Sequence, residues 1–175
     1  MIDFTTIDYL KEGNERQKKA YEVLLKYKIF EKLSNYSPLL AGTVPIGIDI
    51  EGSDLDIICE VDPRFEEDFL DIIMFSKLIP GGGDVKVEYP ILNGEKCITL
   101  NFILEDFPIE IFGQNKPSID QNAYRHMITE HKILQEKGKD FKQKIIELKK
   151  KGIKTEPAFG MLLGLENPYE DLLKY

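Results

Sequence analysis

The sequence predicts an α+β fold, in which a mixed β-sheet core is combined with an N-terminal helix and a helical C-terminal third. Three observations predict it. Apolar residues recur at helical spacing near the N-terminus, short strand-like segments fill the chain from about residue 35 to 114, and helical spacing returns from residue 118 onward. The chain has no repeats and no low-complexity linker, so we expect residues 1–175 to form one domain.

The N-terminal helix is predicted over residues 14–36, where apolar side chains share one face between polar ones. A short buried strand follows over residues 38–41 and runs into a turn at Gly42–Thr43. Residues 44–52 contain a proline and two glycines, but also three isoleucines. We therefore expect an ordered loop or a short helical turn that packs the isoleucines inward.

The middle of the chain begins with a predicted strand over residues 55–61. An amphipathic helix is predicted to follow over residues 62–76, with Asp62 as its N-cap and Pro63 at its first position. The glycine-rich residues 81–84 are interpreted as a loop, because they lack the Lys–Ser/Thr pair of a phosphate-binding P-loop.

Three further strands are predicted over residues 85–90, 96–106 and 107–114, from their alternation of apolar and polar residues. Asn93–Gly94 is the residue pair typical of a two-residue hairpin turn, and we expect it to join the first two of these strands. The predicted sheet is therefore completed by residue 114.

The C-terminal third is predicted to be helical because its apolar residues have helical spacing and its glycines fit C-caps. Gly138 and Gly152 end the first two helices, and Thr155 is a candidate N-cap for the third. Each of the last two helices has a proline near its start. The four predicted helices cover residues 118–138, 139–152, 154–165 and 167–175.

The composition, 42% hydrophobic and 31% charged, is that of an ordinary soluble globular protein. No apolar run reaches the roughly 20 residues that a membrane span needs, and the N-terminus lacks the pattern of a secretory signal, so we expect a cytoplasmic protein without membrane contact. The net charge of −8 argues against general DNA or RNA binding. Cys59 and Cys97 lie in strand-like segments and are predicted to be buried free thiols.

Two aspartates stand one residue apart where the strand after the Gly–Ser turn begins. Asp54 and Asp56 face the same side of that strand, about 7 Å apart, which suits an oxygen-liganded cation such as Mg²⁺. Glu110, between two isoleucines of a later strand, is the candidate third ligand, and Glu88 and Glu105 are weaker alternatives. The alternative interpretation is an exposed strand end with solvated acids.

The sequence Ala41–Gly42–Thr43, a spacer of residues 44–53, and then Asp-Leu-Asp-Ile resembles the motif of the DNA polymerase beta-like nucleotidyltransferase superfamily. The chain also resembles, nearly end to end, an uncharacterised bacterial family catalogued as a domain of unknown function. Residues 42–59, 121–127 and 154–173 underlie that second resemblance. Both resemblances imply a nucleotidyltransferase-like mixed sheet over about residues 35–114.

The resemblance also implies roles for individual residues. Asp54 and Asp56 would bind Mg²⁺ (or Mn²⁺), and Glu110 would bind one metal and help to activate the attacking hydroxyl. Gly42 and Thr43 would contact the triphosphate. Ser53 would help to shape the same loop.

The implied reaction moves a nucleoside monophosphate from an NTP to a hydroxyl group of an unknown acceptor, a small molecule or a protein rather than a nucleic acid. The spacer departs from the family pattern, because it contains Asp49 and Glu51 but no base to bind phosphate. The alternative function is therefore a catalytically inactive module that binds a nucleotide or a partner, as in a toxin–antitoxin-like pair.

Other basic residues are candidates for the missing phosphate contact. Arg125 could bind a phosphate through its guanidinium, although a structural ion pair is an equally supported interpretation. Lys86, on a strand beside the expected site, is a further candidate, with an exposed strand lysine as the alternative. His126 is interpreted as a packed histidine and Glu156 as part of a packed helix start, although Glu156 could face the cleft instead.

Overall fold

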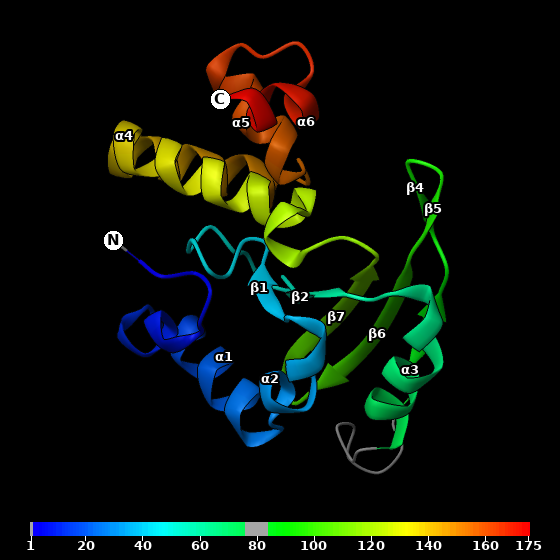
Figure 1. Cartoon of the computed structure of the whole chain (residues 1–175). Helices are drawn as coiled ribbons and strands as arrows, with labels where there is room; N and C mark the ends of the chain where they lie inside the picture. Colours follow the sequence, from blue (N-terminus) through cyan, green and yellow to red (C-terminus); the bar gives the residue numbers. More distant parts are fainter. Residues whose placement is uncertain (1, 76–83) are drawn as a thin grey trace.

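The protein is described by a computed structural model that covers residues 2–75 and 84–175. A five-stranded sheet forms its centre, and the strand order is β1-β2-β7-β6-β3 (Figure 1). Strands β2 and β7 are parallel, whereas the other neighbouring pairs are antiparallel, so the predicted mixed sheet and α+β class are confirmed. The strands are β1 (Leu39–Ala41), β2 (Leu55–Glu60), β3 (Lys86–Glu88), β6 (Ile98–Leu104) and β7 (Phe107–Gln114).

The N-terminal helical segment is broken, so the prediction of one continuous helix over residues 14–36 is wrong. Helix α1 (Glu15–Lys26) begins at a capping box formed by Asn14 and Gln17. Lys28 then adopts a left-handed backbone with φ of 54°, which ends the helix and redirects the chain. Beyond Lys28 follow the short helix α2 (Ile29–Lys32) and the 3-10 turn η2 (Ser34–Tyr36), and before α1 lies η1 (Asp8–Glu12).

Between β2 and β3 the chain forms a 3-10 turn, η3 (Pro63–Phe65), and helix α3 (Glu66–Phe75). Asp62 caps this start, because its side chain accepts the backbone N–H of Arg64 at 2.9 Å. Of the glycine-rich residues 81–84, the first three lie outside the described residues, so the loop interpretation stays a prediction.

The predicted hairpin is present, and its end at the turn forms two further short strands. Asn93 and Gly94, with φ of 52° and 83°, connect β4 (Ile91–Leu92) to β5 (Glu95–Lys96) in a separate two-stranded sheet. This hairpin stands away from the main sheet, and β3 pairs directly with β6 (Figure 1). The predicted hairpin is therefore confirmed, because β3 and β6 are its two arms and β4 and β5 continue these arms to the Asn93–Gly94 turn.

One face of the main sheet is covered by the helices α1, α2 and α3 (Figure 1). Leu55, Ile57 and Cys59 of β2 alternate toward this face and are fully buried. They pack against residues of the covering helices such as Leu24 and Phe69, which explains why the strand is apolar on this side. Cys59 and Cys97 are buried free cysteines, as predicted.

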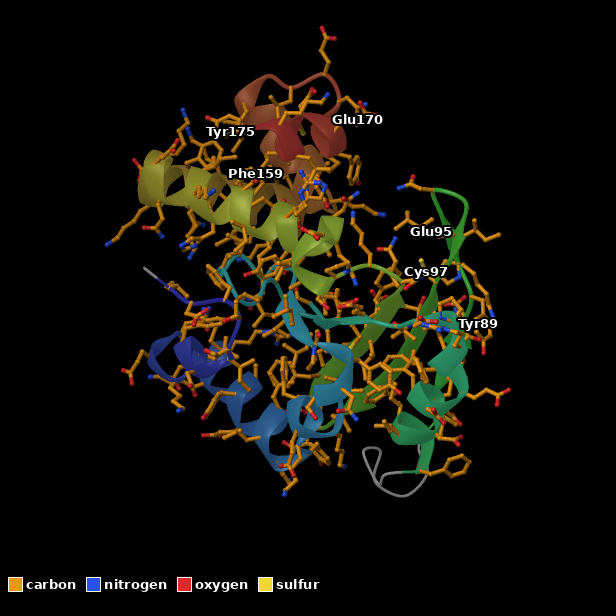
Figure 2. The ribbon with its side chains drawn as sticks, in the orientation of Figure 1. Tyr89, Glu95, Cys97, Phe159, Glu170 and Tyr175 are labelled. Carbon is orange, nitrogen blue, oxygen red and sulfur yellow. The ribbon has the colours of Figure 1, made fainter. Side chains whose placement is uncertain are left out.

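The C-terminal part is helical, and glycines divide it as predicted. Helix α4 (Asn122–Lys150) follows the 3-10 turn η5 (Ser118–Asp120) and is kinked at Gly138, where φ is 77° and ψ is −169°. Phe159 of the next helix is fully buried against α4 (Figure 2). The remaining elements are α5 (Thr155–Leu163), α6 (Pro168–Asp171) and η6 (Leu172–Lys174).

The start of α5 corrects one further detail. Lys154 occupies the N-cap position and makes no side-chain capping bond, whereas Thr155 already lies inside the helix. No described helix is long and apolar enough to span a membrane.

The second face of the sheet is only partly covered. Leu39, Ala41 and Ile58 form a small apolar cluster there, and Tyr124 of α4 packs on it. This contact seats the beginning of α4 over β1 and β2 and leaves the neighbouring part of the same face lined by polar side chains.

Candidate active site

Asp56 and Glu110 are the central pair of the open sheet face. They are direct neighbours across the parallel strands β2 and β7, and such strands lie about 4.8 Å apart. Asp54, two residues before Asp56, points to the same face. The structure therefore brings together the three carboxylates that the sequence predicted, and all three line one cavity of about 460 Å³.

The turn before the spacer lies against these acids. Gly42 has φ of 77°, and a Cβ added at this residue would overlap the Asp56 carboxylate, so the close approach requires glycine. Gly42, Thr43 and Ser53 also line the cavity. The Ser53 hydroxyl accepts the backbone N–H of Ile50 at 2.9 Å, so it closes the end of the spacer loop.

The electrostatics of the acids fit a cation site. Burial raises the pKa of Asp56 well above its usual value, and the charges of Asp54 and then Glu110 raise it further. Burial also raises the pKa of Glu110, with Asp54 adding to the effect. A set of mutually repelling carboxylate oxygens around a backbone turn is the donor chemistry of Mg²⁺ or Mn²⁺, so the residues present fit such an ion.

The spacer loop, residues 44–53, is held by side chains from outside it. Gln17 donates to the Val44 and Pro45 carbonyls, and Lys149 donates to the Ile48 carbonyl at 2.9 Å. The loop turns Ile46 and Ile48 inward, as the sequence predicted, whereas Ile50 is only half-buried.

The acidic residues of the spacer do not line the cavity. Asp49 forms an ion pair with Arg16 at 3.2 Å, and Arg16 also donates to the Ser53 carbonyl at 2.6 Å. Glu51 is exposed. The two spacer carboxylates that argued against phosphate binding are therefore accounted for: Asp49 is paired with Arg16, and Glu51 lies in solvent.

A basic group reaches the cavity from another element. Lys149, near the end of α4, is the one lysine or arginine among the described residues that line it. Burial lowers the pKa of Lys149, and the charges of Glu130, Asp49, Asp56 and Asp54 oppose that shift. Sequence reasoning missed Lys149, because its position over the sheet depends on how α4 packs beyond its kink.

The opposite wall of the cavity comes from α4 and α5. His126 and Glu130, one helical turn apart on α4, lie beside Glu156 of α5. The sequence interpretation of His126 as a packed residue agrees with its 7% exposure, yet its ring also lines the cavity. Glu156 faces the cavity too, so the packing preferred for it was wrong, and Glu130 was not considered.

Two predicted phosphate contacts lie elsewhere. Arg125 is exposed and is not among the residues that line the cavity. Lys86 lies in the cross-strand row beyond Asn101, the neighbour of Glu110, and forms an ion pair with Glu88 at 2.9 Å. Together with Asp54, Lys86 lines a separate groove at the edge of the sheet. Neither residue joins the group around Asp56.

The alternative acids are also placed away from Asp56. Glu105 lies at the far turn between β6 and β7, where it forms an ion pair with Lys26 at 2.6 Å. Glu88 is on β3, which β6 and β7 separate from β2. Of the three candidates for the third acid, Glu110 is therefore the nearest to the aspartate pair in the sheet order.

Comparisons with known proteins agree on the fold. The Cid1 poly(U) polymerase with Mg and 3′-dATP bound is similar, with a TM-score of 0.52 and 14% identity over 82% of this chain and 45% of that chain. A cytoplasmic RNA terminal U-transferase has a TM-score of 0.53 and 11% identity over 84% of this chain and 47% of that one. The chain therefore spans less than half the length of these structures. A comparison with curated proteins gave no match.

The family comparison covers most of the chain. The model of a family described as "Domain of unknown function (DUF4269)" matches residues 22–175. The structural similarity to these proteins, at 11–14% identity, shows a nucleotidyltransferase-like fold. The chain therefore belongs to the family described as Domain of unknown function (DUF4269), and it has the fold of the nucleotidyltransferases.

Proposed function

We propose that the protein is a Mg²⁺-dependent nucleotidyltransferase that moves a nucleoside monophosphate from an NTP to a hydroxyl group of an acceptor. The observation that carries the proposal is the grouping of Asp54, Asp56 and Glu110 in one cavity beside the Gly42–Thr43 turn. Support comes from the fold, since structures of the Cid1 poly(U) polymerase with Mg and 3′-dATP or with MgGTP share it.

Asp54, Asp56 and Glu110 would hold Mg²⁺, or Mn²⁺ in its place. When bound, the metal offsets the negative charge of the triphosphate and lowers the pKa of the attacking hydroxyl. The chain itself holds the metal ligands in register, because Asp56 and Glu110 are fixed on adjacent strands. Asp54 sits directly before β2, where the spacer loop sets its direction.

The remaining groups position the triphosphate and move a proton. The backbone N–H groups of the Gly42–Thr43 turn and the Thr43 hydroxyl donate to phosphate oxygens, and the Lys149 ammonium adds positive charge. The acceptor oxygen forms a bond to the α-phosphorus while the bond to pyrophosphate breaks. Glu110 accepts the proton that the acceptor hydroxyl gives up.

The acceptor is proposed to be a small molecule or a protein. Gln121 and Asn122 line the wall that faces the acids and offer amide groups rather than basic side chains. The net charge of −8 repels a polyanion, so a long nucleic acid is disfavoured.

A catalytically inactive module that binds a nucleotide or a partner is the second candidate. The base-free spacer favours it, because the spacer offers no side chain to phosphate. The placement of Lys149 in the cavity reduces the weight of that objection. The two candidates differ in turnover, which the following experiment measures.

The test incubates the protein with Mg²⁺ or Mn²⁺, each α-phosphate-labelled NTP and a metabolite or protein fraction, and follows label transfer and pyrophosphate release. Asp54→Asn and Asp56→Asn should abolish both. Asp106→Asn, an exposed acid at the β6–β7 turn, is the matched control and should not change them. Metal-dependent NTP binding without turnover in any fraction would favour the inactive nucleotide-binding module. No NTP binding at all would refute the enzyme and the nucleotide-binding module, and would leave the module that binds a partner.

A further inference from the structure

A second cluster of metal-ligating side chains lies on the cavity wall opposite the three acids. His126 and Glu130 stand four residues apart on α4, so they share a helix face, and Glu156 approaches them from the first turn of α5. One potential ligand atom from each of these residues lies within 4.8 Å of the other two. All three residues line the cavity.

The polar groups of this cluster lack partners. The His126 side chain is 7% exposed, and its buried Nδ1 has no hydrogen-bond partner. Glu130 is 4% exposed, and only burial and neighbouring charges, with no hydrogen bond among the described residues, act on the pKa of its carboxyl group. Buried polar groups are normally satisfied, so an unpaired nitrogen on an imidazole that lies beside two carboxylates indicates a missing ligand.

The surrounding elements hold the cluster in place. Met127, next to His126, and Ala158 with Phe159, just after Glu156, are buried in the core between α4 and α5. Lys149, whose charge acts on Glu130, is already hydrogen-bonded to the Ile48 carbonyl. The three ligand groups are therefore fixed by packing, and Lys149 balances part of the Glu130 charge without a bond to the carboxylate.

We propose that His126, Glu130 and Glu156 bind a second divalent ion, of the Zn²⁺ class. Imidazole nitrogen and carboxylate oxygen are both ligands that Zn²⁺ takes in proteins, and three such ligands leave a fourth position open toward the cavity. The inference does not rest on the proposed function, because it uses none of the residues Asp54, Asp56 or Glu110.

Ligand chemistry separates the two sites. The cluster around Asp56 offers oxygen atoms alone, which suits Mg²⁺ or Mn²⁺. A histidine nitrogen shifts the preference toward Zn²⁺ and Co²⁺. The two sites can therefore be distinguished by the metal that each prefers, and the charge of Glu156 also acts on Asp56 across the cavity.

The test uses metal alone, without nucleotide, on the Asp54→Asn/Asp56→Asn double variant, in which the first site is disabled. Co²⁺ serves as a spectroscopic probe, and Zn²⁺ is titrated by calorimetry and by displacement of Co²⁺. We expect one Zn²⁺ per chain and the visible absorption of four-coordinate Co²⁺. Adding His126→Asn or Glu156→Gln should weaken binding by more than about 100-fold, beyond the usual loss for an outer-shell partner.

The chain contains two histidines, so a matched control is available. His131→Asn in the same background should leave Zn²⁺ and Co²⁺ binding unchanged, because His131 packs edge-on against Phe4 and is not in the cluster. Circular dichroism and thermal melting check that each variant is folded, and if His126→Asn unfolds the half-buried Glu156→Gln gives the result. Absence of Zn²⁺ binding, or binding that folded Glu156→Gln does not weaken, would overturn the proposal.

Discussion

The backbone of Gly42 lies so close to the Asp56 carboxylate that a methyl group on Gly42 would overlap it. This contact joins the turn before the spacer to the central acid of the candidate site. Gly42 also has a left-handed backbone, with φ of 77°, which favours glycine whatever the space around it. The glycine is thus needed for two separate physical reasons, and a variant can separate them.

Gly42→Ala should displace the Asp56 carboxylate and abolish both metal-dependent NTP binding and turnover. Gly52→Ala is the matched control, because Gly52 has φ of 82° but no atom within 4 Å of an added Cβ. The control should cost only the strain of the left-handed backbone, about 1–2 kcal/mol of the free energy of unfolding, and keep binding. Calorimetric titration with Mg²⁺ and NTP, with urea unfolding of both variants, measures the difference. Equal effects of the two substitutions would contradict the contact.

Asp62, the N-cap of the turn η3 that precedes α3, predicts that the stability of the fold depends on pH. Hydrogen bonds from the Arg64 side chain, and then from its backbone N–H, lower the pKa of Asp62 to about 2. Because this pKa lies below the ordinary value of 3.8, the ionised Asp62 stabilises the folded state above that pH. The contribution is lost as the pH falls from about 4 to 2.

Asp62→Asn keeps a capping oxygen but removes the charge. The variant should therefore be less stable than the parent at pH 6, and the gap in the free energy of unfolding should close as the pH approaches 2. Urea unfolding at a series of pH values gives that gap. A gap that stays constant below pH 4 would show that the ion pair with Arg64 adds nothing.

The ion pair that neutralises the spacer predicts strong coupling between two residues. Asp49, with its side chain 10% exposed, pairs with Arg16, which also lies over the Phe107 ring at 4.8 Å. Arg16→Met should leave the Asp49 charge buried without a partner, so it should destabilise the fold more than the double variant Arg16→Met/Asp49→Asn. A double-mutant cycle should give a coupling of about 0.5–3 kcal/mol. Additive effects of the two substitutions would mean that the pair is not coupled.

The sequence predicted the sheet and its acids well because strand periodicity is a local property. Alternation put Asp54 and Asp56 on one face, and an acid between two isoleucines singled out Glu110, which the register then placed beside Asp56. The break at Lys28 was not predictable, because lysine is a good helix former and only tertiary packing imposes its left-handed backbone.

The far wall of the cavity depends on contacts between distant parts of the chain. Glu130 and His126 share a helix face that local spacing could have revealed, but Glu156 comes from another helix. The partner of Asp49 is Arg16, on the first α-helix, so the spacer appeared unbalanced in sequence. Lys149 reaches the Ile48 carbonyl only because α4 bends at Gly138 and passes over the loop.

Lys149 has two roles that one substitution tests together. It holds the spacer through the Ile48 carbonyl, and it is the basic group that we propose for the triphosphate. Lys149→Met keeps much of the apolar stem but removes the ammonium, so the unpaired carbonyl should cost about 1–3 kcal/mol of the free energy of unfolding. NTP affinity should fall at least about tenfold if the ammonium contacts phosphate with a charged hydrogen bond.

Lys150→Met is the control for Lys149→Met, because Lys150 is the next residue and is exposed. It should change neither stability nor NTP affinity. Comparing ATP with adenosine in both variants separates the two roles, since only the nucleotide carries the charge that Lys149 would contact. A Lys149→Met protein that is destabilised but binds NTP as tightly as the parent would assign Lys149 to the spacer loop alone, and the triphosphate would then have to be bound by the Gly42–Thr43 turn and the metal.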